Sequence, residues 1–174
     1  YDFDQTEDEA DEQRMTDTYR VISLCFSELG GAEAVGSFFE TSGQREYEVR
    51  VYRHLGDFYL EKLRYNDAAS VYEAFVDLYP IHQASPHFGM RVVEIYEAGD
   101  FPRLVLDSKK AFAESYGLAS DYWRHFDVEE SPAVLSYLKS NLKDLANHYH
   151  ALYQSTERPG DRPAHFAESL LWYR

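Results

Sequence analysis

The histidines are the first residues of this chain that could do chemistry, as ligands of a metal ion. His148 and His150 lie closest together. Side chains two residues apart on a helix point in different directions, so this pair cannot hold one ion as a pair four residues apart could. No His-Glu-x-x-His motif is present, and the other histidines are scattered at His54, His82, His87, His125 and His165. The sequence therefore predicts histidines that pack or face solvent, and no metal site.

Carboxylates and the single cysteine are the next candidates for catalysis. The chain has 31 acidic residues, but adjacent pairs such as Glu129 and Glu130 do not converge on one point. Cys25 has no basic neighbour that would activate its thiol, and we expect it to be buried in a helix. The motifs of nucleophile elbows, P-loops and dinucleotide-binding turns are absent from the sequence. We therefore predict no catalytic residue, no cofactor and no enzyme activity.

The net charge of the chain is −14, with an isoelectric point near 4.8. Too little positive charge is available to neutralise phosphates, so we expect no binding to nucleic acid or to an anionic membrane surface. The sequence holds no run of about 18 apolar residues, so we expect no direct membrane insertion. A basic polypeptide partner is compatible with this charge.

Apolar residues recur at intervals of three and four along most of the chain, which predicts an all-α fold. Residues 1–10 are acidic and show no clear period, and we interpret them as an N-terminal arm, either solvated or the frayed start of a helix. Ser85 and Ser131, each followed by proline, are expected to cap two helices. The expected helices cover residues 11–29, 32–41, 46–63, 66–78, 85–99, 100–116, 121–123, 131–154 and 165–174. The first of them is expected to turn inward Met15, Tyr19, Ile22, Cys25, Phe26 and Leu29.

Residues 52–80 carry aromatic, small and apolar side chains at fixed offsets. The positions in question are Tyr52, Leu55, Gly56, Tyr59, Ala68, Tyr72, Phe75 and Pro80. This stretch resembles a tetratricopeptide repeat (TPR), a 34-residue helix–turn–helix unit, although Phe75 stands where the family usually has a small residue. Gly56 costs about 1 kcal/mol relative to alanine inside a helix. It implies a close approach of the second helix, for which we expect Ala68 as the small partner.

The same pattern recurs in weaker form, so repeat units are expected at about 15–46, 49–82, 85–117 and 131–174. In the third unit, Leu104 and Ser108 follow Ala68 and Tyr72 by 36 residues. In the fourth unit, the positions expected to match the central repeat are Leu145, Ala146, Tyr149, Ala167 and Leu171. The resemblance implies a single domain over residues 11–174, with antiparallel helix pairs stacked as a right-handed TPR-like superhelical solenoid.

In TPR arrays the first helix of each pair lines a concave groove that binds a partner. By the family's positions, the groove residues would be Arg50, Arg53, Asp57 and Leu60 in the central unit, and Gly89, Val93 and Tyr96 in the next. Arg50 and Arg53 could bind a carboxylate or phosphate through two hydrogen bonds each. Alternatively, they pair with Glu46 and Asp57 one helical turn away. The lysines and asparagines of the chaperone-binding TPR clamp are missing from this face, so that ligand is not expected.

Residues 98–117 and 121–123 resemble large multi-TPR proteins of the Gram-negative bacterial cell envelope. The positions that carry this resemblance are Lys109, Lys110, Tyr116, Gly117, Tyr122 and Trp123. It implies a periplasmic assembly or interaction scaffold. The chain begins at Tyr1 and stops inside an apolar helical pattern, and we expect it to be part of a longer protein.

Three functional hypotheses follow. The first is a non-catalytic scaffold that binds another polypeptide in its groove or spaces domains in a larger envelope protein. The second is the regulatory or helical portion of a larger hydrolase. The third is a homo-oligomer in which the open end of the last helix, residues 170–173, packs against a second copy.

Overall fold

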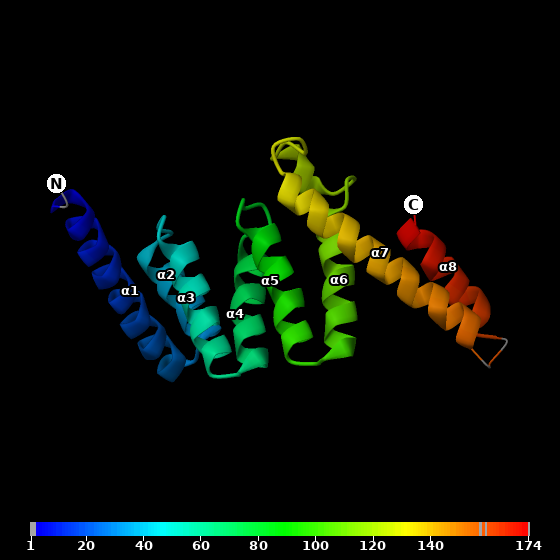
Figure 1. Ribbon diagram of the computed structural model, residues 1–174, viewed down its shortest axis with the longest axis horizontal. Coiled ribbons are helices and arrows are strands. Elements are labelled where there is room, and N and C mark those ends of the chain that lie inside the picture. The colour runs from blue at the N-terminus through cyan, green and yellow to red at the C-terminus, as the bar shows by residue number, and fades with distance from the viewer. Residues whose placement is uncertain (1–2, 157, 159, 174) are drawn as a thin grey trace. The chain divides into compact units, whose positions relative to one another are not determined.

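The computed structural model describes residues 3–156, 158 and 160–173, with side chains from Glu12 onward, and these residues are helical with no strand (Figure 1). The predicted all-α class is therefore confirmed. The elements are α1 (Phe3–Leu29), α2 (Ala32–Ser42), α3 (Glu48–Glu61), α4 (Tyr65–Leu78), α5 (Ser85–Ala98), α6 (Pro102–Tyr116), the 3₁₀ helix η1 (Asp121–Arg124), α7 (Pro132–Ser155) and α8 (Arg162–Tyr173).

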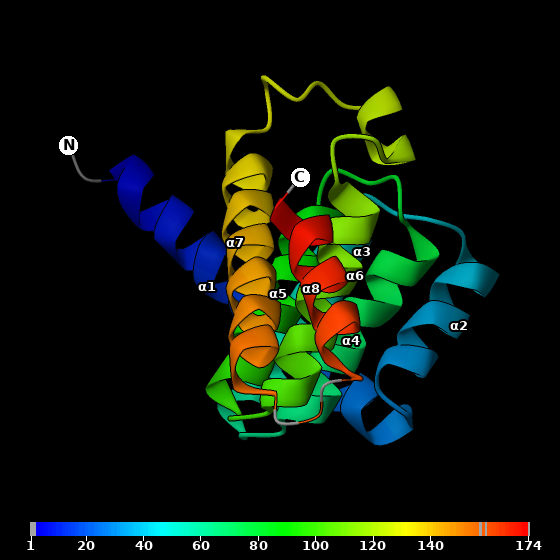
Figure 2. The same cartoon turned by 90° about the vertical axis from the view of Figure 1, so that its right-hand side faces the viewer.

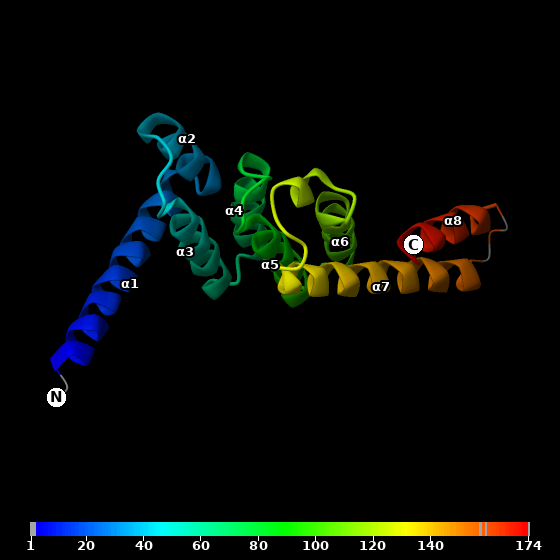
Figure 3. The ribbon, with the colours of Figure 1, turned by 90° about the horizontal axis from the view of Figure 1, so that it is seen from above.

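The helices fall into two compact units, residues 1–79 and 80–174. In the first unit, α3 packs against α4, and α1 packs against α3. In the second unit, α5 packs against α6, α6 against α7, and α7 against α8. Figure 1 shows that the consecutive pairs α3–α4, α5–α6 and α7–α8 are antiparallel, and Figure 3 shows α8 lying along α7.

Most helix ends lie within two residues of their predicted positions, and the main exceptions have local causes. Helix α1 begins at Phe3 rather than near residue 11, since residues 3–29 contain no glycine or proline to interrupt it. Ser85 was expected to precede its helix, but it is the first residue of α5 and Ala84 is the cap. Ser131 is the cap residue of α7 as predicted, although its side chain makes no capping hydrogen bond.

The core of the first unit forms where α3 meets α4. A methyl group on Gly56 would lie 2.4 Å from Cε2 of Tyr72, so only glycine fits at this position. Tyr72 is itself buried, and its hydroxyl donates to Oδ1 of Asp57 at 2.8 Å. The expected close approach is therefore real, but the nearest partner is Tyr72 and not Ala68. An aromatic ring packed against glycine brings the helices together as effectively as two small residues would.

Helix α1 turns a different face inward from the one that its periodicity predicts. Tyr19 is buried and stacks on His54 of α3, with ring centroids 4.4 Å apart and planes 7° apart. Met15, Cys25 and Leu29 are exposed, so their predicted burial is wrong. The face with Tyr19 is the one that α3 covers, and apolar spacing alone does not say which face a neighbour will cover.

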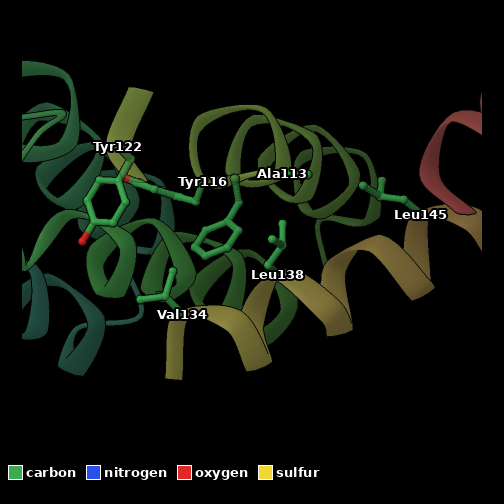
Figure 4. Close-up of a cluster of buried hydrophobic side chains, with 7 residues drawn as sticks. Ala113, Tyr116, Tyr122, Val134, Leu138 and Leu145 are labelled. Atoms are coloured by element: carbon green, nitrogen blue, oxygen red, sulfur yellow. The ribbon is translucent and has the colours of Figure 1, made fainter. Parts of the chain in front are cut away.

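The core of the second unit is an aromatic and aliphatic cluster of Phe112, Ala113, Tyr116, Tyr122, Val134, Leu138 and Leu145. Figure 4 shows Val134 and Leu138 projecting from α7 toward α6. The connection between α6 and α7 contains η1 (Figure 2). Its Trp123 donates from Nε1 to the carbonyl oxygen of Tyr116 at 2.9 Å. The aromatics of residues 121–123 thus cover the end of α6, and the short helix expected there is present.

The α3–α4 and α5–α6 hairpins share one turn geometry. Leu63 and Asp100 both adopt the left-handed conformation, with φ of 57° and 58°. The following amide nitrogens, of Arg64 and Phe101, donate to the carbonyls of Tyr59 and Tyr96 at 2.9 and 3.0 Å. The left-handed residues donate as well, from the amide of Leu63 to the carbonyl of Leu60 at 2.9 Å and from the amide of Asp100 to that of Glu97 at 3.2 Å. The two bonds in each turn define a Schellman turn.

These two turns lie 37 residues apart, whereas the sequence comparison matched the hairpins at 36. The predicted register of the second hairpin is therefore wrong by one residue. In the observed register, Tyr96 takes the place of Tyr59, and Phe112 takes that of Phe75. Both members of each pair are buried. The predicted spacing of 36 residues was wrong because the sequence does not show at which residue the first helix of the hairpin ends and the turn begins.

Helix α8 also departs from its predicted register. Its Ser169 is buried and donates to the carbonyl oxygen of Ala146 on α7 at 3.3 Å, while Trp172 packs against the core cluster. Ala167 and Leu171, which were expected to point inward, are exposed. The buried face thus lies about two residues earlier than predicted. The turn after α7 has no counterpart in the central repeat, so the repeat period could not be counted across it.

Among the described helices, no single one has the length and apolar character needed to cross a membrane. By length and composition alone, the bent pair formed by residues 12–29 and 32–42 meets that requirement, with 106° between its two helices.

Candidate binding cleft

The second unit contains a solvent-open cleft of about 370 Å³, formed by the ends of α5 and α6 and by the middle of α7. One wall is apolar and consists of Tyr96, Phe101, Pro102, Val105 and Leu106. The rim is polar and consists of Glu97, Asp100, Lys109, Asp144 and His148. An apolar wall combined with a few polar groups is the usual composition of a ligand site, and the volume lies at the lower end of the usual range.

The turn between α5 and α6 shapes the mouth of the cleft. Asp100 is left-handed, a conformation that aspartate tolerates better than most residues. Pro102 is in the first turn of α6, where its fixed backbone angle suits a helix start. Between them, Phe101 packs edge-on against Tyr96, with ring centroids 6.2 Å apart and planes 89° apart. The local sequence Gly-Asp-Phe-Pro therefore places a carboxylate and an aromatic ring side by side at the mouth.

Lys109 holds the three helices of the cleft together. Its side chain is only 11% exposed, and its Nζ lies 2.9 Å from Oε1 of Glu97 on α5 and 2.7 Å from Oδ2 of Asp144 on α7. Burial lowers the pKa of Lys109, but the hydrogen bonds and charges of Asp144 and Glu97 outweigh burial and raise this pKa above its ordinary value. The lysine is therefore charged at neutral pH and bridges α5, α6 and α7.

The rim of the cleft has an excess of negative charge. Glu97 and Asp144 keep 49% and 48% of their side-chain surface exposed, so they face solvent as well as Lys109. Asp100 is exposed, and within the described residues no lysine or arginine forms an ion pair with it. Three carboxylates and one ammonium group thus line the cleft.

The acidic and imidazole groups of the rim do not form a metal centre. Nowhere in the described part of the chain do three or more His, Cys, Asp or Glu side chains gather closely enough to hold a metal ion. His148 lies at the rim, and His150, two residues later on α7, is hydrogen-bonded with Gln154 at 2.9 Å. The cleft is suited to binding a ligand, which would contact the apolar wall and the charged hydrogen-bond acceptors of the rim.

The predicted groove residues of α5 turn inward. Tyr96 forms part of the cleft wall, but only 7% of its surface is exposed. Val93 is fully buried and Gly89 lies against the rings of Phe112 and Tyr116. The expectation that Val93 lines an open face is therefore not met. In the 37-residue register Val93 occupies the place of Gly56, an inward position, which explains its burial.

The predicted groove residues of α3 lie in the first unit and do not contribute to this cleft. Arg50 and Arg53 are exposed, and Leu60 is partly buried. Asp57 and the carbonyl of Arg53 both accept from the hydroxyl of Tyr72, at 2.8 and 3.1 Å. Glu46 lies in the turn before α3, so the helical spacing expected to pair it with Arg50 does not apply. Binding by the α3 residues stays a prediction.

Sequence reasoning missed the acidic residues of the rim. Glu97 and Asp100 lie close together at the end of α5 and its turn, but Asp144 lies far along the chain on α7, and no local pattern connects it with them. Lys109 is the residue that carries a signal, because a lysine at an inward position requires carboxylates nearby. Its inward position follows from the 37-residue register, where it replaces the buried Tyr72, and the sequence alone indicated a spacing of 36.

The chain matches no protein-family model, no curated protein and no solved structure.

Proposed function

We propose that the chain is a non-catalytic interaction scaffold that binds another polypeptide in the cleft between α5, α6 and α7. The observation that carries this proposal is the composition of the cleft, with aromatic and aliphatic side chains on one wall and hydrogen-bonding charges on the rim. Extended polypeptides bind such surfaces by placing side chains in the apolar part and polar groups at the edge. The earlier alternative, a helical portion of a hydrolase, stays a prediction that a substrate panel would test.

We also propose that the helix pairs form part of a right-handed TPR-like solenoid. Three facts support this arrangement: consecutive helices form antiparallel hairpins, two hairpins share one turn geometry, and equivalent aromatic residues are buried in both. Each repeat in such an array depends on its neighbours for a continuous core. An assembly role in a bacterial cell envelope, implied by the residues around Lys109 and Trp123, belongs to the same proposal.

The polypeptide-binding proposal can be tested by selecting random 12-residue peptides on the immobilised chain and mapping each binder by amide chemical shifts. We expect the largest shifts at Phe101, Val105 and His148. Val105→Trp should fill the cleft and weaken binding at least tenfold, because Val105 is a partly exposed member of the wall. Ala111→Trp is the matched control, since Ala111 is exposed on the same helix outside the cleft. Peptides that bind Val105→Trp as tightly as the unmodified chain would contradict the proposal.

Self-association is a second candidate, favoured by the apolar side chains that α8 exposes. These are Phe166, Leu170, Leu171 and Tyr173, with 40% to 60% of their surface accessible. If a second copy covers this face, light scattering should show a concentration-dependent rise in mass that Leu171→Glu abolishes. A mass that stays monomeric up to millimolar protein would remove this candidate.

A further inference from the structure

We propose that the cleft recognises a cationic side chain, an arginine or lysine of the partner polypeptide. This inference rests on the proposed function, because it names the chemical class of side chain that the same cleft takes. Three features of the cleft favour such a side chain, namely the charge of the rim, the separation of the carboxylates and the nature of the wall.

The charge of the rim favours a cation. Lys109 is largely buried and already lies within 3 Å of two carboxylates, so its charge is used inside the protein. Glu97 and Asp144 are each about half exposed, and Asp100 is exposed at the turn. An incoming anion would meet these three carboxylates before it reached the ammonium group, and like charges at such range repel. An incoming cation would find acceptors with free lone pairs.

The separation of the carboxylates favours an extended organic cation over a metal ion. A hard divalent ion needs several oxygens within about 2.6 Å of one point. The rim carboxylates, like all others in the described part of the chain, do not converge in that way. A guanidinium group presents five N–H donors in a planar fork and can reach acceptors that are several ångströms apart.

The apolar wall suits the stem of such a side chain. Arginine and lysine carry three or four methylene groups between backbone and charge, and these prefer an apolar surface. Val105 and Leu106 of α6 offer that surface, and Phe101 stands at the mouth beside Asp100. An aromatic ring next to a carboxylate binds a guanidinium on its face while the carboxylate accepts its hydrogen bonds. The cleft therefore holds an arginine more tightly than a lysine.

The test uses four synthetic peptides that differ at one central position. They have the form acetyl-Gly-Ala-X-Ala-Gly-amide, where X is arginine, lysine, citrulline or glutamate. Citrulline has nearly the shape of arginine but no charge, so the pair isolates the electrostatic contribution. Binding to the full chain is followed by amide chemical shifts of Phe101, Leu106 and His148. We expect the arginine peptide to bind at least tenfold more tightly than the citrulline peptide, and the glutamate peptide to cause no shifts.

Asp100→Asn is the decisive variant, because it removes one rim charge without disturbing Lys109. Asparagine tolerates the left-handed conformation, so the turn is retained. We expect arginine binding to weaken three- to tenfold. Glu114→Gln, at an exposed position of α6 outside the cleft, should change it less than twofold. Raising the salt concentration from 0.05 to 0.5 M should weaken binding of the arginine peptide and leave that of the citrulline peptide unchanged.

The outcomes separate this inference from the proposed function. If citrulline and arginine peptides shift the cleft resonances with equal affinity, or if Asp100→Asn has no effect, cation recognition is overturned while the cleft remains a polypeptide site. If none of these peptides and none of the selected 12-residue peptides shifts the cleft resonances, both proposals fail. Tighter binding of the glutamate peptide would reverse the inferred sign of the ligand's charge.

Discussion

The α3–α4 and α5–α6 hairpins have the same turn but fill the space between their helices differently. In α3–α4, Gly56 lies against the ring of Tyr72. In α5–α6, the equivalent positions hold Val93 and Lys109, and the lysine reaches Glu97 and Asp144. The helices of α3–α4 are thus joined by a ring packed against a glycine. Those of α5–α6 are joined by an ammonium group that lies between two carboxylates.

This difference accounts for the acidic rim of the cleft beside the α5–α6 hairpin. Tyr72 fills its site with a ring, and its hydroxyl is satisfied within the hairpin by Asp57. Lys109 takes one carboxylate from α5 of its own hairpin and a second from α7 outside it. Their charged ends have to stay partly in water, because two fully buried carboxylates would cost more than one lysine could offset. Replacing a phenol by an ammonium at one repeat position thus creates an open, acidic rim.

Gly56→Ala should give the largest effect. The new methyl carbon would lie 2.4 Å from the Tyr72 ring, which is buried and fixed by its hydroxyl, so the helices have to move apart. Overpacking of this kind costs about 2–3 kcal/mol, more than the helix propensity that alanine gains. Hydrogen exchange of the α3 and α4 amides would measure the loss.

Two variants control for Gly56→Ala. Gly36→Ala places a methyl group no closer than 3.6 Å to Leu78 and Tyr52, so it should be neutral or should stabilise by up to about 1 kcal/mol. In a Tyr72→Leu background the cost of Gly56→Ala should largely disappear. Equal costs in both backgrounds would show that the glycine is required for another reason.

Lys109→Met should cost about 2 kcal/mol, since it leaves Glu97 and Asp144 without their charged donor, although both are half exposed. Both tryptophans of the chain, Trp123 and Trp172, lie in the second unit, so their fluorescence in urea reports this loss. Lys110→Met is the matched control and should cost less than about 1 kcal/mol, because Lys110 is 4.0 Å from its nearest carboxylate. Equal effects of the two variants would contradict the bridging role.

The pH dependence of the Lys109 contribution has a definite sign. Because the pKa of Lys109 is raised in the folded chain, the stability it contributes is fully present below the ordinary lysine value of 10.5. It is lost as the pH rises through the raised value. The difference between the unmodified chain and Lys109→Met should therefore stay constant from pH 7 to about pH 10 and shrink above that. A difference that shrinks already between pH 7 and 9 would be inconsistent with a charged bridge.

Leu63→Gly should stabilise the first unit modestly. Leu63 adopts φ of 57°, where a side chain clashes with the backbone, and its own side chain is 69% exposed. Glycine relieves the clash but adds freedom to the unfolded chain, so we expect a net gain of about 0.5–1 kcal/mol in thermal unfolding. Leu63→Ala keeps the clash and should change stability by less than about 0.5 kcal/mol. An equal gain from alanine would assign the effect to the exposed leucine side chain.

The sequence predicted elements better than it predicted contacts, and the reason is physical. Helix type and most ends follow from apolar periodicity and from residues such as Pro132 and Gly117, which act locally. The register of α5–α6 depended on the left-handed conformation of Asp100, which the local sequence does not predict. Lys109 and its two partners come from three helices, so the cleft could be predicted only with the packing of those helices known. The inward face of α1 depended on which side α3 covers.

His54→Phe should have the smallest effect on stability, and the effect should be visible only in the pH dependence of unfolding. Burial under Tyr19 lowers the pKa of His54, and the nearby arginines Arg53 and Arg50 add to this against the opposing charge of Asp57. The unfolded chain therefore takes up the proton more readily, so stability falls as the pH drops below the ordinary value of 6.5 toward the lowered one. Phenylalanine keeps the ring stack and cannot titrate. Urea unfolding at pH 8 and pH 5.5 should thus show a smaller loss for His54→Phe than for the unmodified chain, and a larger loss would mean that protonated His54 is stabilised in the fold.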